Sequence, residues 1–78
     1  MASDLDLEWR ARAKGLLKAE LRRRGVSYRL LAERLDEMGI RESEQNLANK
    51  ISRGTFSAIF LLQCFNAIGC KSVAISSD

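Results

Sequence analysis

Histidine and proline are absent from this chain of 78 residues, and cysteine occurs only twice. Histidine is the side chain most often used as a general base and as a metal ligand, so its absence leaves Cys64 and Cys70, with carboxylates, as the donors for any metal. No serine stands in a nucleophile elbow, and no nucleophile has a base to activate it. We therefore expect a protein that is not an enzyme and that holds no metal or other cofactor.

Long apolar runs are missing as well. The longest uninterrupted run, residues 58–62, is far shorter than the roughly 20 residues of a membrane span. The start of the chain is acidic, with Asp4, Asp6 and Glu8, and it lacks the apolar core of a secretion signal. These absences predict a cytoplasmic protein without a membrane partner, and no motif for a small-molecule ligand is evident.

The composition fits one small domain, residues 1–78, in which 46% of the residues are apolar and 29% are charged. No internal repeat, low-complexity tract or linker divides it. The formal net charge of +3 is unevenly spread, since residues 8–24 have seven Lys and Arg against two Glu, giving +5, and residues 25–54 have five of each sign. A basic surface on the first predicted helix fits a nucleic-acid partner.

Serines and glycines divide the chain into helices, because serine favours the N-cap and glycine the left-handed stop. The candidate caps are Ser3, Ser27, Ser43 and Ser57, and the stops are Gly25, Gly39, Gly54 and Gly69. The predicted helices cover residues 4–24, 27–38, 43–53 and 57–68. Alternation of Val73 and Ile75 with small residues predicts a strand over 71–76. We expect an all-α fold of four to five short helices with a helix-turn-helix core and a short C-terminal strand.

The predicted helix 43–53 has one apolar row and one polar face. Gln45, Asn49 and Arg53 form a row at spacing four, and Asn46 and Lys50 form the row beside it. Carboxamides hydrogen-bond to base edges, and Lys and Arg bind phosphates. This pattern indicates a recognition helix, with an ordinary solvated helix surface as the alternative.

The predicted helix 4–24 has two contrasting sides. An apolar stripe from Trp9 to Leu21 predicts a face toward the core, and a cationic row from Arg10 to Arg22 at spacing four runs down the other side. Glu20 falls among the apolar positions, and a partly buried carboxylate needs a partner. We expect Arg53 or Lys50 to provide it.

The predicted helix 57–68 is apolar nearly all round, so it must be buried on most sides. Four short helices cannot easily cover it, and a single strand has no partner for its backbone groups. Both features predict a homodimer, formed by pairing of the tail strand or through this helix. The expected dimer interface contains Ile59, Phe60, Gln63, Val73 and Ile75, and Cys64 is expected to be a buried small residue.

The segments LRRRGVSYRLLAERL, SEQNLANKISRG and FLLQCFNAIGC, within residues 14–70, resemble the lambda-repressor-like (Cro/C1, or Xre) helix-turn-helix class. The chain from Trp9 to about Val73 also resembles a small bacterial family of domains of unknown function. The sequence departs from the helix-turn-helix pattern at one point, because Ala32 and Gly39 are seven residues apart rather than four. This spacing predicts a supporting helix about one turn longer and a looser turn.

The resemblance implies a role for each matching position. It makes residues 27–38 the supporting helix that crosses the DNA backbone, and it turns Glu44, Gln45, Asn46, Asn49 and Lys50 toward the bases of the major groove. It implies phosphate contacts from the start of the supporting helix and from arginines, namely Ser27, Tyr28, Arg29 and Arg53, to which the basic run adds Arg22, Arg23 and Arg24.

Two functions follow from these observations. The first is a dimeric protein that binds double-stranded DNA, as a small transcriptional regulator or as an accessory of a phage or mobile element. The second is a protein-interaction or dimerisation module on the same scaffold that binds no nucleic acid, since a fold does not fix a function.

Overall fold

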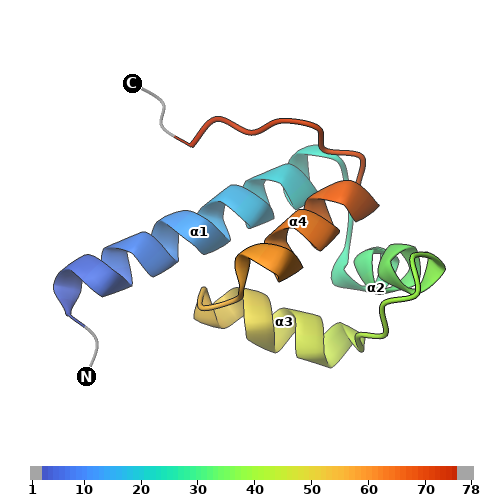
Figure 1. Cartoon of the computed structure of the whole chain (residues 1–78), viewed down its shortest axis with the longest axis horizontal. Helices are drawn as coiled ribbons and strands as arrows, with labels where there is room; N and C mark the ends of the chain where they lie inside the picture. Colours follow the sequence, from blue (N-terminus) through green and yellow to red (C-terminus); the bar gives the residue numbers. More distant parts are fainter. Residues whose placement is uncertain (1–2, 76–78) are drawn as a thin grey trace.

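Four helices make up the regular structure of the computed structural model, which describes residues 3–75 (Figure 1). They are α1 (Asp4–Arg23), α2 (Tyr28–Glu37), α3 (Glu44–Arg53) and α4 (Ala58–Ala67). The predicted helices match these bounds to within one residue at each end. None of the helices among the described residues is both long and apolar enough to cross a membrane.

The helix starts follow directly from the sequence. Each capping serine accepts a hydrogen bond through its side-chain oxygen from the backbone N–H three residues on, at 3.0 to 3.1 Å. Such a cap satisfies one of the N–H groups that a helix start leaves unpaired, and its loss typically costs about 1 kcal/mol. The four predicted caps, Ser3, Ser27, Ser43 and Ser57, are all confirmed.

The core lies where the four helices meet. Its most buried side chains have no exposed surface and come from every helix: Leu17, Leu31, Leu35, Leu47, Ile51 and Cys64. The helix α2 packs against both α3 and α4, and α1 packs against α3 (Figure 1). Burying one such leucine or isoleucine contributes about 1.5–3 kcal/mol, so this cluster fixes the relative positions of the helices.

Gly54 sets the distance between α3 and α1. It ends α3 with a φ of 69°, and a Cβ added there would lie 2.6 Å from the backbone oxygen of Arg10. A side chain at this position would therefore be strained by its backbone conformation and would also push α1 away. The C-terminal end of α3 rests directly on the backbone of α1 for this reason.

The predicted strand over residues 71–76 is not formed in its described part, 71–75, and Ser76 lies outside the described residues. The physical reason is pairing, because the described chain contains no second strand to complete its backbone hydrogen bonds. Residues 70–75 instead run back along α1 as an irregular tail (Figure 1).

Trp9 departs from the predicted core stripe. The stripe is confirmed at Leu17 and Leu21, which are buried, but Trp9 is 53% exposed. The N-terminal turns of α1 project past the other helices, so Trp9 borders Leu61, Ile75 and Phe56 at the edge of the domain without being enclosed (Figure 1). The Trp9 ring is partly covered by the guanidinium of Arg12, 4.8 Å from its centroid.

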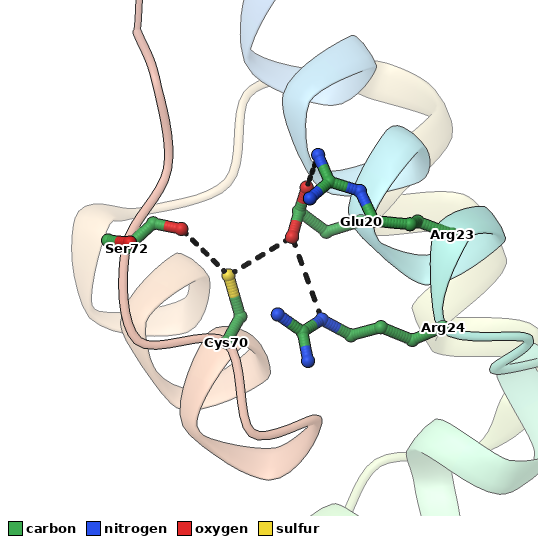
Figure 2. A network of polar contacts seen from close by, with 5 residues as sticks. All are labelled: Glu20, Arg23, Arg24, Cys70 and Ser72. Carbon is green, nitrogen blue, oxygen red and sulfur yellow. Dashed lines mark hydrogen bonds and ion pairs between the residues drawn. The ribbon is translucent and has the colours of Figure 1, made fainter.

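Glu20 is a buried carboxylate at the junction of α1 and the tail, and only 4% of its surface is exposed. Figure 2 shows its two oxygens between Arg23, at 2.8 Å, Arg24, at 3.6 Å, and the thiol of Cys70, whose Sγ lies 3.3 Å away. The Cys70 Sγ also lies 3.4 Å from the carbonyl oxygen of Ser72. These contacts connect the start of the tail to the last turn of α1.

The expectation that Glu20 needs a partner is confirmed, and the predicted partners Arg53 and Lys50 are wrong. The observed arginines stand three and four residues after Glu20 on the same helix, where side chains on one face meet. Lys50 instead pairs with Glu42, which directly precedes the Ser43 cap of α3.

Candidate nucleic-acid interface

The polar face of α3, which we define as Gln45, Asn46, Asn49 and Arg53, is exposed along the whole helix. The Nε2 of Gln45 donates a hydrogen bond to Oδ1 of Asn49 at 3.3 Å, and the Nε of Arg53 donates to the backbone oxygen of Asn49 at 3.3 Å. The predicted row at spacing four therefore lies on one surface as expected. Three carboxamides stand side by side there, each with a donor and an acceptor that can meet a base edge.

This face is exposed because the opposite side of α3 is fixed in the core. Leu47 and Ile51 are fully buried, and they stand on the row opposite the carboxamides. The Ser43 cap and the Gly54 stop define the two ends of the helix. This packing sets the rotation of α3 about its axis and keeps the polar side chains out of the core. A partner could therefore bind the polar face without breaking core contacts.

Lys50 is turned differently from the other predicted base-facing residues. Its Nζ forms an ion pair with Glu42, whose side chain is only 13% exposed, and it lies 5.1 Å from the centroid of the Phe60 ring. Lys50 therefore links the segment before α3 to α4. Its ammonium group is thus held by Glu42 and the Phe60 ring, although helical spacing placed Lys50 with Asn46 in the row beside Gln45 and Asn49, and spacing alone could not show these contacts.

The two acidic residues near the start of α3 differ in their surroundings. Glu42 is neutralised by Lys50, whereas Glu44 is exposed in the first helical turn. A carboxylate there is stabilised by the positive end of the helix dipole. The exposed negative charge near the carboxamides is thus the single residue Glu44, one of the predicted base-facing positions.

Cations of α1 lie beside α3 and beside the start of α2. Lys14 donates from Nζ to the backbone oxygen of Ser52 at 3.1 Å, which places it at the C-terminal end of α3. Farther along the same row, Lys18 and Arg22 line a hollow of about 360 Å³ together with Ser27 and Tyr28 of the α2 start. The row therefore spans the distance between the two helix ends that the resemblance assigns to DNA contacts.

The remaining predicted phosphate contacts are partly engaged by carboxylates. Arg23 and Arg24 pair with Glu20, and Arg29 pairs with Glu33 at 3.8 Å. Arg23 and Arg29 keep most of their side-chain surface exposed, at 73% and 81%, so their charge stays accessible. Among residues 3–75, no ion pair involves Lys14, Lys18 or Arg22.

Cys64 and Cys70 are both buried and reduced. Burial, together with the nearby carboxylate of Glu42 and against a lowering by Lys50, raises the pKa of the Cys64 thiol to about 12. A thiol with so high a pKa is neutral and unreactive at ordinary pH. Within the described residues, no group of three or more His, Cys, Asp or Glu side chains is arranged to hold a metal.

The predicted dimer-interface residues are divided between surface and core. Ile59 and Ile75 are 69% and 81% exposed, and Gln63 is half-buried. Phe60 is buried, with its ring 5.6 Å from that of Phe56, and Val73 packs against the core. Sequence reasoning missed Leu62, which is 67% exposed, although it stands three residues after Ile59 and shares its helix face.

The comparison with known families gives one match. A family model described as a domain of unknown function (DUF6471) matches residues 9–73. The chain belongs to the DUF6471 family. The DUF6471 domain therefore includes α2, α3 and α4 completely, with α1 from Trp9 onward, and the predicted resemblance to a family of unknown function is confirmed.

No curated protein and no solved structure matches the chain. None of the comparisons confirms the lambda-repressor-like resemblance. The function of this DUF6471 domain therefore has to be argued from its own surface.

Proposed function

We propose that this DUF6471 domain binds double-stranded DNA with α2 and α3 as a helix-turn-helix pair, and that it acts as a small transcriptional regulator or as an accessory of a phage or mobile element. The observation that carries the proposal is the polar face of α3, where three exposed carboxamides stand on a helix that the core holds rigidly. Such a helix can enter the major groove, whose base pairs present distinct hydrogen-bonding patterns.

Gln45, Asn46 and Asn49 are the proposed base-reading residues. A carboxamide can donate to N7 of adenine and accept from its N6 amino group in a bidentate pair, and each such pair discriminates by about 1–3 kcal/mol. Because Oδ1 of Asn49 already accepts from Nε2 of Gln45, the side-chain amide of Asn49 is oriented before DNA arrives. Preorganisation of this kind lowers the entropic cost of binding.

The proposed phosphate contacts come from three elements. Ser27, Tyr28 and Arg29 belong to the start of α2, Arg53 to the end of α3, and the α1 row adds Lys14, Lys18 and Arg22. This assignment changes the sequence-based one in two ways. Lys50 becomes a residue that fixes α3 through Glu42, and Arg23 and Arg24 become secondary because they share the Glu20 carboxylate.

The connection between the proposed helix pair is long. Residues 38–43 join α2 to α3, compared with about three to four residues in a typical helix-turn-helix turn. The Glu42–Lys50 ion pair ties this connection to α3 and thereby supports a fixed angle between the two helices.

The experiment that tests the proposal is binding of the full chain to a mixed-sequence duplex across a salt series. We expect the logarithm of the affinity to fall by about 0.9 per log unit of salt for each phosphate contacted. Lys18→Ala should reduce this slope by about one contact and weaken all sequences alike. Arg12→Ala is the matched control, because Arg12 lies against Trp9 on another side of α1. Absence of binding at low salt by the folded protein would refute the proposal.

Base reading is tested separately from phosphate binding. Once a preferred site has been selected, Asn46→Ala should reduce the preference for it over mixed sequence by about 1–3 kcal/mol and leave mixed-sequence binding nearly unchanged. If Asn46→Ala and Lys18→Ala weaken every sequence equally, the assignment of base readers is wrong.

The second candidate is a protein-interaction module that binds no nucleic acid. The observation that favours it is the set of large apolar side chains left exposed on α1, α4 and the tail, such as Trp9, Leu62 and Ile75. In this case the polar face of α3 is ordinary solvated surface. A folded protein that shows no DNA binding but associates with itself or with another protein would favour this candidate.

A further inference from the structure

An apolar patch on the side of α1, α4 and the tail is not used by the proposed DNA interface. We define the patch as Trp9, Leu62 and Ile75, which are 53–81% exposed, over a floor of half-buried Leu16 and Leu61; exposed Ile59 stands three residues before Leu62 on the flank of α4. Leu16, Leu61, Leu62 and Ile75 together line a groove of about 530 Å³ between α1, α4 and the tail. Three elements far apart in sequence thus contribute to one continuous apolar surface.

The α4 and tail side of the patch is nearly free of charge, whereas on the α1 side the guanidinium of Arg12 covers Trp9 and pairs with Glu8. Residues 58–75, which include all of α4 and the described tail, contain Lys71 as their single charged residue. The whole chain carries 13 Lys and Arg and 10 Asp and Glu, so this face differs sharply from the rest of the surface. Depletion of charge with retention of aromatic and aliphatic side chains is typical of the centre of a protein interface.

We propose that this apolar patch binds a second copy of the same chain, forming a two-fold symmetric dimer. Two copies each carry a net charge of +3, so their approach is opposed at the basic surfaces and is least opposed where charge is absent. In a two-fold interface the same patch meets itself, and an uncharged apolar surface does this without pairing like charges. A partner recognised by charge, such as an acidic peptide or nucleic acid, would find only Lys71 and Arg12 here, and Arg12 already pairs with Glu8.

A standard interface buries ~800 Å² per partner, of which the exposed side chains of the patch supply one part. The half-buried floor and the exposed Asn66 at the groove supply another part. Exposed apolar patches rimmed by polar residues mark interaction sites.

A dimer formed in this way leaves the DNA interface free. None of the carboxamides of α3 lines the groove, and the cationic row of α1 contacts α3 and the start of α2 instead. The dimer therefore does not depend on DNA binding, and the two proposals can fail separately. If both hold, each dimer presents two α3 helices to one duplex.

The solution mass of the full chain without DNA tests the dimer. Sedimentation equilibrium over a concentration series should give twice the chain mass of 8.8 kDa. Leu62→Glu should raise the dimer dissociation constant by about 100-fold, because association would bury an unpaired carboxylate. The matched control is Leu7→Glu, since Leu7 is 51% exposed but lies two residues from Trp9, on the other side of α1.

A variant on the tail distinguishes loss of the dimer from misfolding of α4. Ile75→Glu lies outside every helix and is 81% exposed, so it should leave the helical circular dichroism unchanged and still weaken the dimer. A wild-type protein that stays monomeric at millimolar concentration would overturn the proposal. Equal weakening by Leu7→Glu and by the patch variants, or a dimer that withstands both patch variants, would also overturn it.

Discussion

Replacement of Gly54 by alanine tests the docking of α3 on α1, which sets the polar face of α3 beside the cationic row. Two costs arise at this position. The left-handed backbone, with φ of 69°, disfavours alanine by about 1 kcal/mol. The new Cβ would also lie 2.6 Å from the backbone oxygen of Arg10, and moving packed helices apart typically costs about 1–3 kcal/mol. We expect a total loss of about 2–4 kcal/mol in the free energy of unfolding.

Gly25→Ala provides the control for the backbone cost. Gly25 has nearly the same φ, 67°, but an added Cβ there meets nothing within 4 Å. It should therefore cost only about 1 kcal/mol. Urea unfolding followed by circular dichroism measures both variants, and the difference between them isolates the contact with Arg10. Equal losses from the two variants would refute the close approach of α3 to α1.

Three further predictions concern stability. Glu20→Ala should cost about 1–3 kcal/mol in urea unfolding because it removes the buried carboxylate that Arg23, Arg24 and the Cys70 thiol contact. Glu33→Ala, which removes an exposed pair, should change stability by less than about 0.5 kcal/mol, and similar losses from the two variants would contradict the role of burial. Burial raises the pKa of the Cys64 thiol from 9.0 to about 12, so the folded chain binds the thiol proton more tightly than the unfolded chain does. The free energy of unfolding should therefore fall as pH rises from 9 to 12, by up to about 1.4 kcal/mol per pH unit. Cys64→Ala should reduce this pH dependence, and an unchanged dependence would contradict the burial of the thiol. Ser43→Ala should cost about 1 kcal/mol and lower amide protection at the start of α3 in hydrogen exchange, and unaltered protection would exclude the cap.

The helices could be predicted from the sequence because their signals are local. A serine oxygen reaches the N–H three residues on, and this requires nothing beyond the neighbouring chain. The buried rows of α2 and α3, such as Leu31 with Leu35 and Leu47 with Ile51, follow equally from helical spacing. The expectation that Cys64 is buried is confirmed for the same reason.

The errors arose where partners are set by tertiary packing or by competition between neighbours. The direction of Lys50 depends on Glu42 and on a ring of α4, which helical spacing does not include. The exposure of Trp9 depends on how far α1 extends past the other helices. The partners of Glu20 could have been found, because Arg23 and Arg24 stand at the spacing at which helical ion pairs form.

The candidate site was predictable in composition and only partly in geometry. The row of Gln45, Asn49 and Arg53 lies on one exposed surface as helical spacing predicts, but the approach of Lys14 to Ser52 could not be read from a sequence separation of 38 residues. The predicted C-terminal strand is not formed in residues 71–75, because alternation of residue types specifies a strand only where another strand is available to pair.

The most direct test of the proposed DNA interface is a nuclear magnetic resonance titration of the labelled full chain with duplex DNA at low salt. The side-chain amide signals of Gln45, Asn46 and Asn49 report the proposed base-reading groups individually. The account predicts that these signals and the backbone amides of α3 and of the α2 start, Ser27 to Arg29, shift most. Shifts confined to α4 and the tail, or no shifts at all, would contradict it.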